Sequence, residues 1–428
     1  MPAPDREQGA PAATLPERLL VSILAVGAVA APYLLRGLDD NRLTSWRWVF
    51  GARNPAALFA LVLAAALFAQ LAARPVPVRR QEAVLFLCAY AAGACFWGEP
   101  EPIVDAARYF TQAKHLELYG LAHFLREWGR EIPAWTDLPL VPLLDGLVLR
   151  ASGESRVALQ AFTTLLFAGS AVLTSRIGKA LWDEEVGFAA GALLLAIPYL
   201  LTQVPLTLVD VPTLFFVTLA VYASILAFRR GSTSRILLAS AALSLALLSK
   251  YSAWLLLSVL PIVGAVHAKE GGARRALLTG ALMAAGAGAL VLGAVLPHRE
   301  VYGEQLRLLL GYQAPGLRRW GESFLSTFLF QVHPFLTAAA ALSLWVAVRR
   351  RDWRWAVAAW PVLLLVGLEV RRIRYLLPAF PMLALLGAYG LQAVRGSGVR
   401  RLVVPPPCSP RSWWRGGATC PSSGARAR

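Results

Sequence analysis

The chain has 428 residues, of which 57% are apolar and 16% are charged. Soluble domains contain roughly 45–50% apolar and about 25% charged residues, so this composition excludes an ordinary soluble globular protein. The formal net charge of +17 would suggest nucleic acid as the partner of a soluble protein. Here the basic residues lie mostly in short segments between apolar runs, which is typical of a membrane protein with cationic loops on one side. We therefore expect a membrane protein and no nucleic-acid partner.

About twelve apolar runs are long enough to be candidate transmembrane helices. They lie at 19–35, 55–73, 82–97, 157–174, 187–203, 211–228, 236–249, 251–267, 276–296, 325–347, 355–370 and 376–394. Only Lys250 separates the seventh run from the eighth, and we expect two short helices that meet at one surface rather than one broken helix. The sequence thus predicts an all-α integral membrane protein, built as a polytopic bundle.

The charges of the loops predict the orientation of this bundle. If the N-terminus is cytoplasmic, most of the excess of Lys and Arg lies on the cytoplasmic side, for example at Arg229-Arg230 and at 349–351. The segment 36–54 is an exception, because it carries four arginines on the predicted outer side. We expect a multi-pass protein of the plasma membrane with its active site on the extracytoplasmic side.

Three regions follow from this topology. Residues 1–97 form a cytoplasmic leader and three transmembrane helices, and residues 98–394 form the core. The core contains long outer segments at 98–156 and about 297–324, and loops of this length are usually functional. Residues 395–428 contain Pro405-Pro406-Pro407 and clusters of Ser, Gly and Arg, which predict a disordered, basic, cytoplasmic tail.

The first outer segment contains a helical pattern of polar residues. Asp105, Tyr109 and Gln112 are spaced at i, i+4 and i+7, which places them on one stripe of a helix. Asp105 could cap this helix, since Asp is a favoured N-cap, or it could be catalytic; helix geometry leaves both open. Asp137 and Asp145 follow among prolines, and there a re-entrant connector with Asp137 as a turn residue is favoured over direct catalysis.

Three further charged positions lie at the ends of apolar runs. Asp210 is followed by Val211-Pro212 at the start of a helix, and a carboxylate at this depth favours function over capping alone. Lys250 could extend to the membrane interface or bind an anionic lipid headgroup. Arg371 and Arg374 lie on the side where the charge rule predicts few cations, which favours phosphate binding over an ion pair with Glu369 or interfacial anchoring.

The sequence lacks the motifs of several common kinds of enzyme. The sequence has no HExxH, P-loop, dinucleotide-binding or GxSxG motif, and its five histidines have no metal-ligand spacing. No metal site is therefore predicted. A secondary transporter also uses about twelve spans and remains an alternative, although no repeated halves are evident. A non-catalytic membrane scaffold is a third interpretation.

The acidic residue of the first outer segment is followed by PLVPLL (139–144), LVDVPTLFF (208–216), ALLSKYSAW (246–254) and RYLLPAFP (374–381). Taken in this order, these segments resemble the GT-C glycosyltransferases, in particular the group of dolichyl-phosphate-mannose protein mannosyltransferases and aminoarabinose transferases. The resemblance covers roughly residues 98–394, the GT-C-like core, and it is strongest from 104 to 265.

The resemblance implies an enzyme that moves a hexose or pentose from a polyprenyl-phosphate carrier to a hydroxyl of a glycan, lipid or protein, with inversion at the anomeric carbon. It implies Asp105 as the catalytic base, Asp210 as the acidic residue of a later outer turn, and Lys250 and Arg374 near the carrier phosphate. We expect the substrate site also to include Tyr109, Asp137, Arg371 and Tyr375.

One departure concerns the first outer segment. Many members have Asp-Glu there, whereas this chain has Asp105-Ala106, so the second carboxylate is absent or is supplied by Asp137. A divalent cation could assist the phosphate, but no paired-carboxylate spacing requires one, and no other cofactor is expected.

Overall fold

The computed structural model describes residues 80–98, 103–313 and 323–392. The first two predicted spans and the predicted disordered tail lie outside these residues. Within them, the chain is helical and forms no strand, apart from one isolated bridge between Trp128 and Ile132. The predicted all-α class is therefore confirmed.

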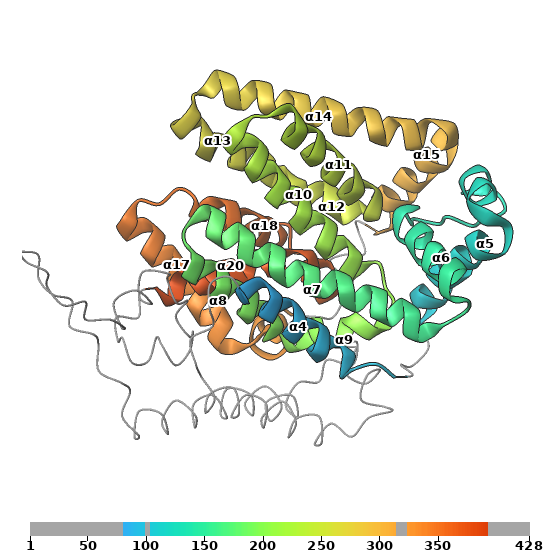
Figure 1. The fold of residues 1–428 in the computed structure, drawn as a ribbon, viewed down its shortest axis with the longest axis horizontal. Coiled ribbons are helices and arrows are strands. Elements are labelled where there is room, and N and C mark those ends of the chain that lie inside the picture. The colour runs from blue at the N-terminus through green and yellow to red at the C-terminus, as the bar shows by residue number, and fades with distance from the viewer. Residues whose placement is uncertain (1–79, 99–102, 314–322, 393–428) are drawn as a thin grey trace, which may run out of the picture.

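The helices follow one another with short connections, and several are joined by single 3₁₀ or π turns (Figure 1). They are α4 (Gln81–Ala94), α5 (Val104–Glu127), α6 (Leu140–Ser152), α7 (Arg156–Leu181), α8 (Glu184–Leu195), α9 (Pro198–Gln203), α10 (Asp210–Arg230), α11 (Thr233–Ser249), α12 (Tyr251–Leu256), α13 (Leu260–Gly271), α14 (Ala273–Val295), α15 (Arg299–Leu308), α17 (Pro334–Arg350), α18 (Trp355–Gly367), α19 (Ile373–Leu376) and α20 (Phe380–Leu391).

Five helical segments of the described chain are long and apolar enough to cross a membrane. They are Arg156–Leu181, Asp210–Arg230, Tyr251–Lys269, Ala273–Gly311 and Ile373–Leu391. The helices α8 and α9, which are bent by 57° at the break between them, would together add a sixth span, and α4, α11 and α18 are shorter apolar helices. The protein is therefore a multi-pass membrane protein, with fewer long spans in its described part than the sequence predicts.

The predicted breaks and loops agree with the structure at some positions and differ from it at others. Lys250 has an extended backbone and separates α11 from α12, so the expected pair of short helices is present. His333 and Pro334 interrupt the predicted span 325–347. In contrast, residues 297–324 were expected to form a loop, yet helix continues from Ala273 through Gly311. Pro297 is tolerated there because it occupies the first turn of a short helix.

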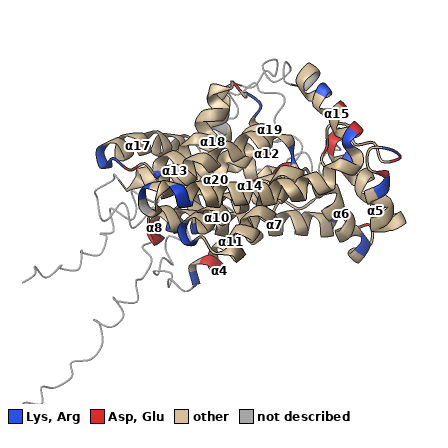
Figure 2. Ribbon diagram, turned by 90° about the horizontal axis from the view of Figure 1, so that it is seen from above, with Lys and Arg blue, Asp and Glu red and all other residues tan. Residues whose placement is uncertain are grey.

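Charged residues gather at the two ends of the bundle, and the middle is almost free of them (Figure 2). Helices α5, α6 and α15 lie at one end, where α10 begins, and the turns after α10 and α17 lie at the other. This distribution is what a bilayer requires, because charges are costly at its centre.

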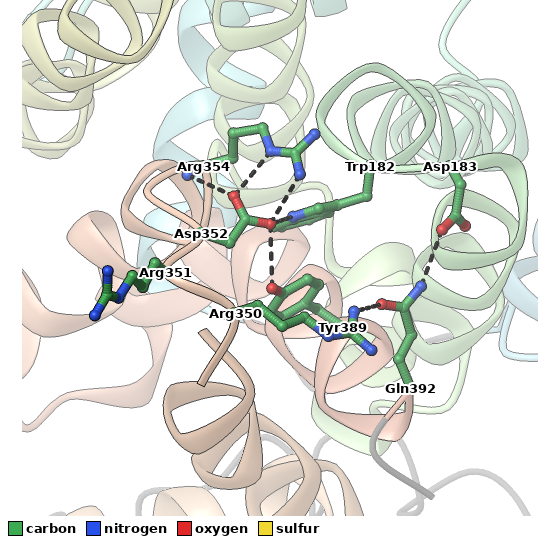
Figure 3. Close-up of a pocket in the computed structure, with 8 residues that line it drawn as sticks. All are labelled: Trp182, Asp183, Arg350, Arg351, Asp352, Arg354, Tyr389 and Gln392. Carbon is green, nitrogen blue, oxygen red and sulfur yellow. Dashed lines mark hydrogen bonds and ion pairs between the residues drawn. The ribbon is translucent and has the colours of Figure 1, made fainter. Parts of the chain in front are cut away.

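Asp352 lies between α17 and α18 and joins three parts of the bundle (Figure 3). Its carboxylate accepts hydrogen bonds from Trp182 Nε1 at 2.9 Å, from Tyr389 Oη at 3.1 Å and from Arg354 Nε at 2.8 Å. Trp182 directly follows α7, Tyr389 belongs to α20, and Arg354 directly precedes α18. The cluster therefore fixes the turn between α17 and α18 against the core of the bundle.

Helix α20 is the most deeply packed of the spanning helices and lies against α8, α17 and α18. Small residues allow this approach. A Cβ atom at Gly390 would overlap the carbonyl oxygen of Ala339 on α17. Any side chain at this position would therefore force the two backbones apart.

We expect Gly390→Ala to lower the melting temperature of the detergent-purified protein by several degrees, because overpacking against a backbone costs about 1–3 kcal/mol. Gly293→Ala is the matched control, since a Cβ atom at Gly293 meets no atom within 4 Å. Equal melting temperatures for the two variants would contradict the packing described for α17 and α20.

Candidate functional site

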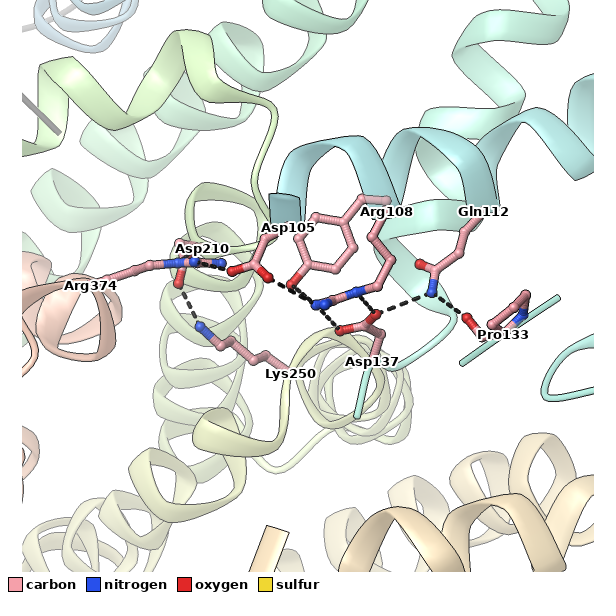
Figure 4. Close-up of polar contacts among 9 residues, drawn as sticks. Asp105, Arg108, Gln112, Pro133, Asp137, Asp210, Lys250 and Arg374 are labelled. Carbon is pink, nitrogen blue, oxygen red and sulfur yellow. Dashed lines mark hydrogen bonds and ion pairs between the residues drawn. The ribbon is translucent and has the colours of Figure 1, made fainter. Parts of the chain in front are cut away.

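Three carboxylates and three cations alternate along one line at the end of the bundle where α5 and α10 begin (Figure 4). Lys250 Nζ lies 2.6 Å from Asp210 Oδ1, and Arg374 Nε lies 2.6 Å from Asp210 Oδ2. A second nitrogen of Arg374, Nη1, donates to Asp105 Oδ2. Arg374 therefore bridges two aspartates that are 105 residues apart in the sequence.

Arg108 continues this line from Asp105 to Asp137. Arg108 Nη2 lies 3.3 Å from Asp105 Oδ1, and Arg108 Nε lies 2.6 Å from Asp137 Oδ2. Arg108 Nη2 also donates to Asp137 Oδ1 at 3.0 Å, which makes this pair bidentate. We call the six residues the charge chain: Lys250, Asp210, Arg374, Asp105, Arg108 and Asp137.

The charge chain is assembled from helix ends. Asp105 is the second residue of α5, and Asp210 is the first residue of α10. Lys250 lies at the break between α11 and α12, and Arg374 lies in α19, before the last apolar helix. Side chains at such ends lie at the membrane boundary, where charges are tolerated.

Neither aspartate is held as a helix cap. The residue before α5 is Ile103 and the residue before α10 is Val209, and neither helix start has a capping side-chain bond. The carboxylates of Asp105 and Asp210 instead pair with cations from other segments. The capping interpretation, which the sequence left open for Asp105, is therefore not what the structure shows.

The two carboxylates that flank Arg374 differ in access to solvent. The side chain of Asp210 is 0% exposed, whereas that of Asp105 is 31% exposed. Each carboxylate oxygen of Asp210 is paired with a cation, and the side chain is closed to solvent, so Asp210 cannot contact a solute directly. Asp105 is the carboxylate that an approaching molecule could contact.

The cations keep Asp105 ionised. Burial alone would raise its pKa, but the guanidinium groups of Arg374 and Arg108 outweigh burial and hold the pKa of Asp105 below its ordinary value. For Asp137, burial dominates over the attraction of Arg108, so its pKa is raised. The surroundings thus shift the pKa values of the two carboxylates in opposite directions.

Two further residues of the predicted polar stripe, Tyr109 and Gln112, lie beside the charge chain. Gln112 donates to Asp137 Oδ2 at 3.1 Å and to the carbonyl of Pro133 at 2.8 Å. Tyr109 is buried, its hydroxyl accepts from Arg108 at 3.5 Å, and burial raises its pKa. The stripe of Asp105, Tyr109 and Gln112 therefore does face one cluster.

Tyr375 and Arg371 have different surroundings. Lys250 Nζ lies 4.6 Å from the centre of the Tyr375 ring, so Tyr375 borders the charge chain. Arg371 is 46% exposed and lies 4.0 Å from Glu369, outside the charge chain. For Arg371 the structure therefore shows the ion pair with Glu369, which was an alternative to phosphate binding.

Arg108 is the residue of this cluster that sequence reasoning missed. It lies three residues after Asp105, a spacing that brings the two side chains together on a helix. That spacing was available in the sequence. Its bidentate contact with Asp137, 29 residues away, was not, because the contact depends on the loop before α6.

Among the described residues, no three His, Cys, Asp or Glu side chains come together as a metal site. Asp145, the other aspartate of the proline-containing segment, is buried in α6 and makes no contact in the charge chain. Burial raises the pKa of Asp145 to about 7.

We expect Arg374→Met to destabilise the protein by roughly 3–5 kcal/mol, because it removes a partner of the buried Asp210 carboxylate. Arg371→Met, three residues away on an exposed side chain, should change the unfolding midpoint little. Thermal unfolding of both variants in the same detergent measures the difference. If Arg371→Met were as damaging as Arg374→Met, the burial assigned to the charge chain would be wrong.

Comparisons with known proteins agree with the sequence resemblance. Residues 136–299 match the family model for dolichyl-phosphate-mannose-protein mannosyltransferase. No curated protein gave a significant match.

Two solved structures are similar to this chain. One is ArnT from Cupriavidus metallidurans bound to undecaprenyl phosphate, with 15% identity and a TM-score of 0.50, covering 85% of this chain and 62% of that chain. The other is the Archaeoglobus fulgidus oligosaccharyltransferase in complex with zinc and sulfate, with 13% identity and a TM-score of 0.45, covering 72% of this chain and 49% of that chain. This chain therefore spans about three fifths of the length of ArnT. The predicted resemblance to the GT-C glycosyltransferases is confirmed, and the chain has the helical fold of ArnT.

Proposed function

We propose that this protein is a membrane glycosyltransferase. It takes a hexose or pentose from a polyprenyl-phosphate carrier and transfers it, with inversion, to a hydroxyl of a glycan, lipid or protein. The observation that carries the proposal is the partly exposed carboxylate of Asp105, held beside Arg374 at the end of an apolar helix bundle.

Asp105 acts as the general base in this reaction. The acceptor hydroxyl attacks the anomeric carbon, the bond from that carbon to the phosphate oxygen breaks, and the hydroxyl proton moves to Asp105. A hydroxyl is a poor nucleophile until it loses this proton. Because Arg374 and Arg108 keep Asp105 ionised at neutral pH, the base is in its reactive form before substrate binds.

Arg374 and Lys250 stabilise the leaving phosphate. The electron pair of the broken bond goes to the carrier phosphate, so negative charge develops on its oxygens and needs preorganised donors. Asp210 is fully buried and contacts both cations, at 2.6 Å each. We assign Asp210 the role of fixing Arg374 and Lys250, with Tyr375 beside Lys250 as a wall of the donor site.

The lipid donor fits the location of the charge chain. A polyprenyl tail lies in the bilayer, so its phosphate reaches residues at the ends of spanning helices, as Asp210 and Arg374 are. ArnT, whose fold this chain shares, was solved with undecaprenyl phosphate, which supports a carrier of this class. A transporter would bind its substrate near the midplane of the membrane.

The orientation of the protein follows from its charges. Arg229, Arg230 and 349–351 lie at the end opposite the charge chain, and basic loops favour the cytoplasmic side. We therefore place the charge chain on the extracytoplasmic side of the plasma membrane. A divalent cation could assist the phosphate there, and chelation would test its contribution.

We expect Asp105→Asn to lower the transfer rate roughly 10²- to 10⁴-fold, which is the usual contribution of a general base. The donor is first identified as the polyprenyl-phosphate sugar that accumulates in cells lacking the protein. The transfer rate is then measured in membranes, as the movement of label from this donor to product. Glu154→Gln is the control, because it removes an exposed carboxylate of the same outer region.

Two outcomes would contradict the assignment. Normal transfer by Asp105→Asn protein would remove Asp105 as the base. Movement of labelled solute across sealed vesicles, without any covalent product, would instead indicate a transporter.

The pH dependence of kcat/KM provides a second test. The active form of Asp105 is deprotonated and its pKa is lowered, so activity should be lost only as the pH falls below the ordinary range of aspartate. Arg108→Gln removes one of the cations that lower this pKa, so the acid limb should move to higher pH. Arg108→Lys keeps the charge and should move the limb less. If the acid limb of the pH profile were the same in the wild-type protein and in both Arg108 variants, Asp105 would be excluded as the group that titrates.

A further inference from the structure

A groove opens at the end of the bundle opposite the charge chain. It has a volume of about 640 Å³ and lies between the turn from α10 to α11 and the start of α14. Because α10 runs from Asp210 to Arg230, the groove is one helix length, about 30 Å, from the candidate active site. The proposed sugar transfer does not use it.

Two arginines form the mouth of this groove. Arg274 and Arg275 are exposed and make no ion pair with any side chain that the structure describes. Arg275 lies across the turn from α10 to α11, where a Cβ atom at Gly231 would be 2.9 Å from Arg275 Nη2. The guanidinium therefore spans the opening between α10 and α14.

The position of these arginines on α14 concentrates positive potential. They are the second and third residues of the helix, and its first turn contains no acidic residue. The start of a helix already carries partial positive charge, so cations are unfavourable there without an anion nearby. An anion at the mouth of the groove would relieve this repulsion.

The wall of the groove is apolar and belongs to the membrane-facing surface. Leu278 and Leu282 lie one turn apart on α14 and are 55% and 56% exposed, and Ile236 of α11 completes the wall. Only 17% of the most apolar stretch of the helix that begins at Ala273 is buried in the protein. This helix therefore lies at the periphery of the bundle. A soluble anion would leave this wall unused.

We propose that the groove binds one anionic glycerophospholipid of the leaflet opposite the candidate active site. The lipid phosphate contacts Arg274 and Arg275, and an acyl chain lies along Leu278, Leu282 and Ile236. Basic pockets between membrane helices are known to bind anionic headgroups. The arginines supply the charge complementarity, and the apolar wall selects a lipid over free phosphate.

The test titrates dioleoylphosphatidylglycerol into the full-length protein held in phosphatidylcholine nanodiscs and measures bound lipid by native mass spectrometry. We expect Arg274→Ala/Arg275→Ala to weaken phosphatidylglycerol binding roughly 30-fold, which corresponds to about 2 kcal/mol for two cations. Leu278→Asn/Leu282→Asn should also weaken binding of the lipid, although it keeps both charges.

Arg230→Ala/Arg235→Ala is the matched control, because it removes two basic residues of the same end that do not line the groove. Phosphatidylglycerol binding by this control should remain at the wild-type level. An equal loss in the control would show diffuse surface charge and overturn the proposal. So would displacement of the lipid from the wild-type protein by millimolar inorganic phosphate, since that outcome assigns the arginines to a soluble anion.

Discussion

The contact of one guanidinium with two aspartates organises the end of this protein where α5 and α10 begin. Arg374 binds Asp210 through Nε and Asp105 through Nη1, so α5, α10 and the segment before α20 share one ion. A buried charge without a partner costs several kcal/mol. The relative positions of these three segments are therefore restricted by electrostatics as well as by packing. A shift of α10 by one residue would turn Asp210 away from both of its cations.

Part of this arrangement was predictable, because helical periodicity and the cost of charges in lipid act locally. The stripe of Asp105, Tyr109 and Gln112 follows from the period of the helix, and the break at Lys250 follows from one charge between two apolar runs. Asp210 was selected because a carboxylate next to a span is expensive. In each case the sequence itself contains the physical reason.

The remainder depends on contacts between distant segments. The bidentate pair of Arg108 and Asp137 requires the loop before α6 to fold against α5, which no local pattern specifies. The continuation of helix beyond Pro297 was missed for a related reason. There, Tyr302 and Gln305 of α15 are buried, and Gln305 hydrogen-bonds Tyr251 at 2.6 Å and the carbonyl of Asp137 at 3.0 Å. Tertiary contacts thus stabilise a helix in a stretch whose polar composition predicted a loop.

The alternation of charge along the chain also suits the proposed reaction. Asp105, Asp137 and Asp210 balance Arg108, Lys250 and Arg374, so the cluster carries no net charge when all six are ionised. During transfer, the proton gained by Asp105 removes one negative charge beside Arg374, and the departing phosphate gains one. If the phosphate lies on the open side of Arg374, negative charge only moves from one neighbour of the guanidinium to another. The total charge that the cations must stabilise is the same before and after the bond breaks, so little reorganisation of the buried ions is needed.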